Sequence, residues 1–234
     1  MVKGASWRKI VYILGVPGTG KSSVGRKLAT GLGGEYIDVS ELVVRKRFYT
    51  AYDPECFTHV ADVRRLSKYL TEKASSPDRC LVISSNFAVR VPGAKDFVVF
   101  LLRCSPLVLM ERLRERGYDD KKISDNLVAE LIGLSLDDAY TTFGSKKVIE
   151  IDATNLGLSL LVSRMTEELA RGVHASRDRV DWISKLEGDP ALDDLLLFIS
   201  RHTPVPELSP ARHRRRRARA SLRHGGRLRR ASAR

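Results

Sequence analysis

The chain has 234 residues, 43% of them hydrophobic, which is enough apolar material for a folded core and excludes a wholly disordered protein. Its formal net charge of +13 is uneven, because residues 211–234 contain eleven arginines and no acidic residue, and the first 210 residues carry only +2. We therefore predict a nearly neutral domain, residues 1–203, followed by a proline-containing linker and an arginine-rich disordered tail, residues 204–234.

The predicted elements alternate along the chain. Five short apolar runs are expected to form strands, at residues 10–14, 36–39, 81–84, 97–102 and 148–151. Helical spacing, together with start and stop residues, predicts helices at residues 22–32, 106–116, 124–143, 156–170 and 192–201. The polar and aromatic residues 40–76 are expected to form helical patches around a turn at Tyr52-Asp53-Pro54. This alternation predicts an α/β fold with a parallel sheet between helices.

A phosphate loop follows the first predicted strand. Residues 15–22, Gly-Val-Pro-Gly-Thr-Gly-Lys-Ser, match the pattern G-x-x-x-x-G-K-[ST]. Glycines let main-chain amides wrap a phosphate chain, and the N-terminus of the next helix adds partial positive charge. A glycine turn that binds nothing would not require the Lys-Ser pair, so we predict binding of ATP with Mg²⁺ as cofactor. The residues expected to contact ATP are Gly18, Thr19, Gly20, Lys21, Ser22 and Ser23.

Three of these side chains have separate expected roles. Lys21 would reach the β- and γ-phosphates, the Ser22 hydroxyl would bind Mg²⁺, and Ser23 would donate to the α-phosphate. The sequence lacks the N-K-x-D element of GTPases, and large motor ATPases need a longer chain. A small kinase remains, which needs an acceptor-binding segment after the second strand and a short basic lid after the fourth.

Candidates exist for both segments. Residues 40–60 occupy the acceptor position, and residues 117–123 the lid position. Arg112 and Arg116 are four residues apart and are expected to point from one helix face toward the lid, where positive charge would neutralise a transferring phosphoryl group. The same arginines fit a solvated, salt-bridged helix face equally well.

Several stretches together resemble a known family. They are the phosphate loop, Glu35-Tyr-Ile-Asp-Val-Ser-Glu-Leu, Tyr52-Asp53, and Glu111-Arg-Leu-Arg-Glu-Arg-Gly-Tyr-Asp-Asp-Lys-Lys-Ile-Ser-Asp-Asn126. In order, from about Lys9 to Trp182, they are similar to the adenylate kinase isoenzyme six family, which comprises archaeal adenylate kinase homologues and their eukaryotic nuclear counterparts. The resemblance implies a P-loop kinase fold with a five-stranded parallel sheet, an acceptor segment at about residues 38–61, and a short lid at about 115–125.

The resemblance also implies activity and partners. It implies a nucleoside monophosphate kinase that converts ATP and AMP into two ADP, with ATPase activity and a role in small ribosomal subunit maturation through a ribosomal protein. The resemblance assigns a contact with ATP to Lys21 and Arg116 but leaves Arg112 undecided; we expect Lys21, Arg116 and Arg112 to be the catalytic residues. The alternative is a nucleotide-gated ribosome assembly or RNA-binding factor with weak or no kinase activity, in which the basic tail contacts rRNA.

Two departures from the family pattern weaken the expected activity. The family ends its third strand with Asp, one residue and His, whereas this chain has Ser84 and Asn86 there. Ser84 can still hold the magnesium through a water but adds no charge, and neither residue can act as a base at neutral pH. In the acceptor segment the family arginine is displaced by one place to Arg45, the candidate for binding the acceptor. One place on a helix is a rotation of ~100°, so the sequence leaves open whether Arg45 faces the acceptor phosphate.

Each of the remaining candidates could also have a purely structural role. Asp152 lies where such folds place the adenine but also suits loop chemistry, and Asp38 could face the active site or cap a helix. Asp62 suits a surface acid, and Trp182 suits a core anchor. The cysteines are 24 residues apart, which fits no metal motif or disulfide set, and no apolar run approaches the ~20 residues of a bilayer span. We expect a soluble cytoplasmic protein.

Overall fold

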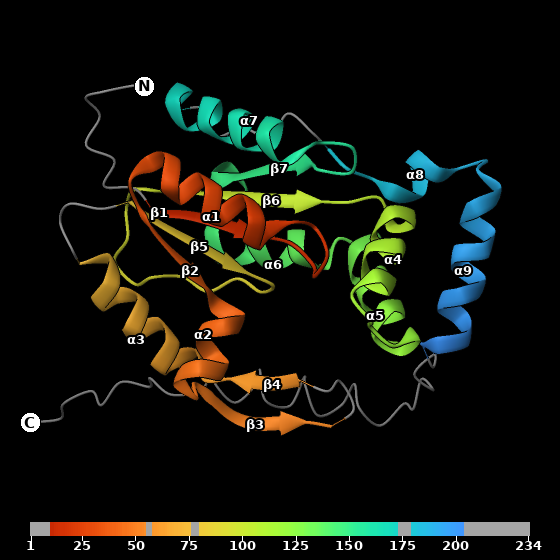
Figure 1. Cartoon of the computed structure of the whole chain (residues 1–234), viewed down its shortest axis with the longest axis horizontal. Coiled ribbons are helices and arrows are strands. Elements are labelled where there is room, and N and C mark those ends of the chain that lie inside the picture. Colours follow the sequence, from red (N-terminus) through yellow and green to blue (C-terminus); the bar gives the residue numbers. More distant parts are fainter. Residues whose placement is uncertain (1–9, 55–57, 76–79, 173–178, 204–234) are drawn as a thin grey trace, which may run out of the picture. The chain divides into compact units, whose positions relative to one another are not determined.

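The computed structural model describes residues 10–54, 58–75, 80–172 and 179–203. The predicted basic tail and Cys56 lie outside these described residues. The described part of the chain forms a five-stranded sheet with the order β2-β5-β1-β6-β7, in which every neighbouring pair is parallel (Figure 1). Its strands are β1 (Ile10–Leu14), β2 (Glu35–Asp38), β5 (Leu81–Ser85), β6 (Phe97–Arg103) and β7 (Val148–Asp152). The predicted five-stranded parallel α/β sheet is confirmed.

Helices cover both faces of the sheet. One apolar cluster packs Val11, Val82 and Phe100 against α1 (Lys21–Leu32) and α7 (Leu158–Arg171). The opposite cluster packs the other side chains of the same strands against three helices, α2 (Val39–Lys46), α3 (Val63–Ala74) and α6 (Leu134–Phe143). Because β1, β5 and β6 are buried on both faces, their sequences are continuously apolar rather than alternating.

A further group of helices has its own small core. It consists of α4 (Pro106–Glu115), α5 (Asp120–Leu131), α8 (Trp182–Leu186) and α9 (Pro190–His202). The strand arrowheads in Figure 1 point toward this group, so the helices stand beyond the carboxyl ends of the strands. In open parallel sheets this is the edge where ligands bind. In the described ranges, no helix is long and apolar enough to cross a membrane.

The end of α4 follows the predicted glycine stop. Arg116 is the C-cap, and Gly117 takes the left-handed conformation with φ 71°. The Tyr118 amide donates to the Leu113 carbonyl, and the Gly117 amide donates to the Arg114 carbonyl. Only residues 116–119 separate α4 from α5, so the predicted lid, residues 115–125, consists mostly of two helix ends.

One predicted helix is wrong. Residues 124–143 do not form a continuous helix, because α5 ends at Leu131 and α6 starts at Leu134. Gly133 lies between them with φ 68°, a left-handed conformation that ends a helix and that glycine adopts without strain. A short 3-10 turn, η1 (Ser145–Lys147), then leads into β7.

The predicted acceptor segment, residues 38–61, contains a hairpin that the sequence pattern did not reveal. After α2 the chain forms β3 (Tyr49–Asp53) and β4 (Thr58–Ala61), which pair antiparallel with an irregular register between Tyr49 and Ala51. The predicted turn residues Tyr52 and Asp53 therefore end a strand. The second predicted strand also ends one residue early, because Asp38 caps α2 and Val39 is already helical.

Candidate functional site

The loop of residues 15–20 connects β1 to α1 in a conformation that needs its glycines. Gly15, Gly18 and Gly20 have φ values of 143°, 93° and 92°. A Cβ atom at Gly15 would lie 2.5 Å from the Leu102 carbonyl oxygen, and one at Gly18 would lie 2.6 Å from Cδ1 of Leu109. The loop backbone therefore packs closely against β6 and α4, and the first turn of α1 opens directly from it.

Lys21 begins α1 and turns back into the loop. Its Nζ donates to the Val16 carbonyl oxygen at 2.8 Å, and Thr19 Oγ1 donates to the same oxygen at 3.0 Å. The Lys21 side chain is buried, and this desolvation lowers its pKa to about 7. The Asp38 and Glu130 carboxylates act to raise this pKa, while the Arg116 charge lowers it further. The loop therefore keeps the Lys21 amino group largely shielded from water.

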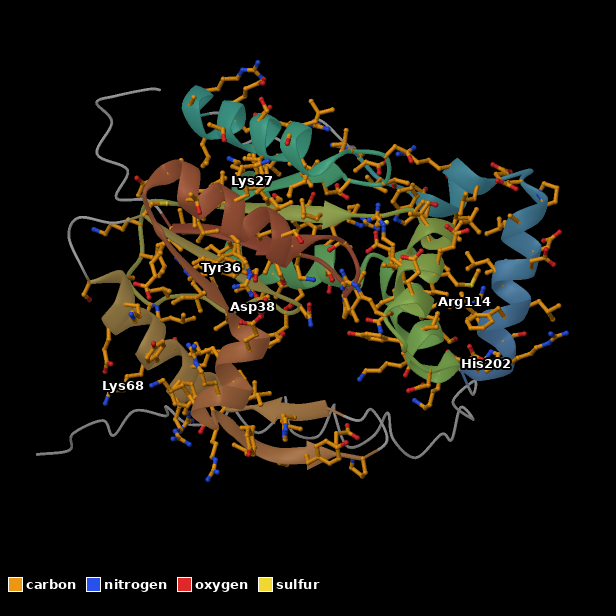
Figure 2. The ribbon with its side chains drawn as sticks, viewed as in Figure 1. Lys27, Tyr36, Asp38, Lys68, Arg114 and His202 are labelled. Atoms are coloured by element: carbon orange, nitrogen blue, oxygen red, sulfur yellow. The ribbon has the colours of Figure 1, made fainter. Side chains whose placement is uncertain are left out.

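A carboxylate and three hydroxyls meet beside the loop. Ser22 Oγ donates to Oδ2 of Asp38 at 2.8 Å, and the Tyr36 hydroxyl donates to the same oxygen at 3.1 Å. Ser84 Oγ lies 2.7 Å from the Tyr36 hydroxyl and 3.4 Å from Oδ2 of Asp38. Burial raises the pKa of Tyr36, so its hydroxyl stays protonated at neutral pH. Tyr36 and Asp38 are labelled in Figure 2, close together where β2 runs into α2.

Asp38 also caps α2, as the sequence indicated. Its Oδ1 accepts from the amides of Ser40 and Glu41, at 3.0 and 3.3 Å. One carboxylate oxygen therefore fixes the helix start, and the other faces the hydroxyls of Ser22 and Ser84. The two roles that the sequence left open for Asp38 are both present.

These side chains line a cavity of about 210 Å³. The sequence-predicted residues around it are Gly18, Gly20, Lys21, Ser22, Ser23, Ser84 and Arg116. Thr19 is buried, and its hydroxyl serves the loop rather than the cavity. Asp38, for which the sequence left this position open, also lines the cavity, as do Glu41 and Tyr118, which were not predicted. Asp38 had a detectable signal, since it ends a strand at the sheet edge where ligands bind.

Two further cavities adjoin the first. A cavity of about 720 Å³ lies between the loop and the helices α5 and α6, and one of about 450 Å³ lies over α2 and β4. Ser40 and Asn86 line all three cavities. The concave surface is therefore continuous from the phosphate loop to the predicted acceptor segment.

The structure does not bring the other two predicted arginines to these cavities. Arg112 donates to the Thr154 carbonyl oxygen at 3.0 Å and lies 3.4 Å from Sγ of Cys104. The prediction that Arg112 and Arg116 both point toward the lid is wrong, because Arg112 is held by the Thr154 carbonyl after β7, whereas Arg116 lines the first cavity. Arg45 is exposed on the last turn of α2, and it lines none of the three cavities. Its charge acts to lower the pKa of Lys73 on α3.

Three minor candidates have structural roles. Asp152 accepts from the amide and hydroxyl of Thr154 and from Lys185 Nζ at 2.8 Å. Although burial acts to raise the pKa of Asp152, these hydrogen bonds lower it. Asp62 caps α3 by accepting from the Arg65 amide. Trp182 is a buried core anchor, as predicted.

A buried ionic network holds the end of β6 beside the site. Arg103 donates from Nε to Glu130 and from Nη1 to Glu150, both at 2.8 Å, and each of the three side chains is at most 3% exposed. The Trp182 indole and the Cys104 amide donate to the same Glu130 oxygen. Burial raises the pKa of Glu130, and the Arg103 charge opposes that shift. The network therefore connects α5 and α8 to strands β6 and β7 of the sheet.

Comparisons with known proteins give a matching family model, similar proteins and solved structures of a similar fold. A protein-family model described as "AAA domain" matches residues 11–133. A protein of Pyrococcus abyssi named "Putative adenylate kinase" is 32% identical over 173 residues, which cover 74% of this chain and 91% of that protein. The "Adenylate kinase isoenzyme 6 homolog" of Caenorhabditis elegans is 30% identical over 146 residues, 62% of this chain and 80% of that protein. A solved shikimate kinase of Acinetobacter baumannii aligns over 70% of this chain and 93% of its own at 22% identity, with a TM-score of 0.46.

Proposed function

The chain belongs to the family of adenylate kinase isoenzyme 6 and its archaeal homologues, and we propose that it transfers the terminal phosphoryl group of ATP to AMP or a related nucleoside monophosphate. The observation that carries the proposal is the cavity where Lys21, Ser22 and Arg116 meet and which continues into the two neighbouring cavities. Donor and acceptor phosphates would lie on one continuous concave surface, as in-line transfer requires.

The donor triphosphate would bind to the loop and the first turn of α1. Main-chain amides there would donate to the phosphate chain, and the helix N-terminus would add partial positive charge. The Lys21 ammonium would leave the Val16 carbonyl for a phosphate oxygen. Arg116 is exposed at the cavity wall and would stabilise negative charge on the migrating group.

The atoms beside the loop fit a magnesium ion that accompanies ATP. Ser22 Oγ, Ser84 Oγ and Asp38 Oδ2 are hard oxygen donors gathered within hydrogen-bonding distances. Ser22 would hold the ion, with Ser84 acting through a water. When bound, Mg²⁺ supplies charge neutralisation on the phosphate oxygens.

The acceptor needs little base catalysis, because a phosphate oxygen is already ionised near neutral pH. The cavity next to the loop carries Lys122, which would meet the acceptor phosphate in place of the displaced Arg45. Hydrolysis of ATP is different, since water must lose a proton. Asn86 lines the cavity where a base would act and cannot accept that proton, so we propose that ATPase activity is the weaker of the two.

The test is ADP formation from ATP with and without AMP. Strong stimulation by AMP supports the kinase. Arg116→Ala is expected to lower kcat by about 10²-fold, the usual effect of removing one transition-state donor. The matched control is Arg114→Ala, which removes an exposed arginine of the same helix that stacks on Phe198 at 5.3 Å. Equal rates for the two variants would contradict the assigned role of Arg116.

A second function is favoured by one observation, the replacement of the family Asp and His by Ser84 and Asn86. It is a nucleotide-gated factor of small ribosomal subunit maturation, with the arginine-rich tail binding rRNA phosphates. Slow ATP hydrolysis that AMP does not stimulate would support it. A chain ending at Ser209 should then bind RNA more weakly and with a smaller salt dependence than the full chain, and equal affinities and salt slopes would exclude the tail.

A further inference from the structure

The carboxylate that contacts the Ser22 hydroxyl belongs to Asp38 of β2, whereas the family places an aspartate on β5. Ser84 is the next-to-last residue of β5 and stands where a family member has an aspartate, but it brings no charge. Strand β2 lies next to β5, and the register pairs Asp38 with Ser84. As a result, Oδ2 of Asp38 lies 3.4 Å from Ser84 Oγ and 2.8 Å from Ser22 Oγ. A carboxylate is therefore present at this point of the site, on the neighbouring strand.

We infer that Asp38 replaces the missing aspartate of β5 and supplies the carboxylate that holds the magnesium of a bound Mg-nucleotide. The inference rests on the proposed nucleotide binding. Magnesium in such sites is usually held by one or two carboxylates together with phosphate oxygens and waters. Asp38, with the Ser22 hydroxyl beside it, provides that set without help from residue 84.

The orientation of Asp38 supports a role beyond capping a helix. A cap needs one acceptor oxygen, and Oδ1 already accepts the amides of Ser40 and Glu41. Oδ2 is left toward the cavity, where the Tyr36 hydroxyl fixes its position at 3.1 Å. The Tyr36 ring is itself confined, because a Cβ atom at Gly25 of α1 would lie 2.4 Å from its edge. The carboxylate is thus oriented before any ligand binds.

Asp38→Asn separates the two roles. Asparagine caps helices about as well as aspartate, so the start of α2 is preserved, while the charge that a cation requires is lost. Asp62→Asn is the matched control, because Asp62 also caps a helix, accepts from the Arg65 amide and lines none of the three site cavities. Both variants should unfold at temperatures close to that of the unchanged protein.

The measurement is ADP affinity by calorimetry at pH 6.5, in excess Mg²⁺ and in EDTA. The quantity of interest is the ratio of the two dissociation constants. In the unchanged protein Mg²⁺ should lower the dissociation constant of ADP. In Asp38→Asn this Mg²⁺ effect on the dissociation constant should be at least tenfold smaller, the usual effect of losing a group that orients a metal site. Its affinity in EDTA should stay within about threefold of the unchanged protein, and Asp62→Asn should leave the ratio unchanged. Mn²⁺ bound with ADP, followed by electron paramagnetic resonance, should show the same loss of metal binding.

A second variant checks the geometry. Asp38→Asn combined with Ser84→Asp returns a carboxylate to β5 and should recover most of the magnesium effect, which a purely structural role of Asp38 would not allow. A wild-type ratio in Asp38→Asn, or no magnesium effect in the unchanged protein, overturns this inference alone. Failure of the unchanged protein to bind ADP in either condition overturns the proposed function and the inference with it.

Discussion

The unusual state of Lys21 makes nucleotide binding depend on pH. Burial in the loop lowers the pKa of this lysine from its ordinary value near 10.5 to about 7. In the free protein about half of the Lys21 side chains are then charged at pH 7, and about one in a hundred at pH 9. A bound phosphate chain restores a charged partner, so the nucleotide complex holds the Lys21 proton to a higher pH than the free protein does.

The sign of the effect follows from this difference. Above pH 7 the complex binds more protons than the free protein, so nucleotide binding takes up a proton and weakens as pH rises. Below about pH 6 both states are almost fully protonated and the dependence disappears. If binding requires the charged lysine, the dissociation constant should rise about 50-fold between pH 7 and pH 9. The second ionisation of the nucleotide phosphate, near pH 6, is almost complete in this window.

Calorimetry in two buffers with different ionisation enthalpies measures both quantities. We expect uptake of close to one proton per ADP at pH 9 and a much smaller uptake at pH 6. Lys21→Met should bind weakly and without this pH dependence. Lys27→Met is the control, since Lys27 is an exposed lysine of the same helix that donates to Ser159 Oγ. Constant affinity from pH 7 to pH 9 with no proton uptake would refute the reasoning.

Two further predictions concern the backbone of the phosphate loop and the buried ionic network at the end of β6. Gly18→Ala should weaken ADP binding at least tenfold and lower the free energy of unfolding by about 1–2 kcal/mol, because Gly18 has a φ of 93° and the new Cβ atom would meet Leu109. The control is Gly31→Ala, which should change neither quantity, because nothing lies within 4 Å of its new Cβ atom. Glu130→Gln should lower the free energy of unfolding in urea by about 3 kcal/mol, because the buried Arg103 charge loses one of its two carboxylates; a loss below 1 kcal/mol would contradict this account.

Features that depend on neighbouring residues could be predicted from the sequence. The phosphate loop is eight consecutive residues, and its glycines, lysine and serine adopt the arrangement that the pattern requires. The apolar runs at residues 81–84 and 97–102 formed strands because burial on both faces requires continuous apolar sequence. Gly117 ended α4 for the equally local reason that its φ is positive.

Features that depend on distant residues could not be predicted in this way. The spacing of Arg112 and Arg116 indicated a shared direction, but it could not show which distant groups each side chain contacts. The site of Arg112 is set by Thr154, which is 42 positions later in the sequence. The helical spacing of residues 124–143 did not show that the chain breaks at Gly133, which takes a positive φ between α5 and α6. The contact between Asp38 and Ser22 depends on the order of strands in the sheet, which no local pattern contains.

The same contact links the metal and the pH dependence. Among the charges that act on Lys21, Asp38 contributes most to keeping it protonated. Asp38→Asn should therefore lower the pKa of Lys21 below 7, and the weakening of ADP binding should begin at lower pH when measured in EDTA. A carboxylate that acted only through magnesium would leave the profile in EDTA unchanged. Because one carboxylate contacts the hydroxyls of Ser22 and Ser84 and also acts on the charge of Lys21, both magnesium binding and the protonation of Lys21 depend on the same side chain.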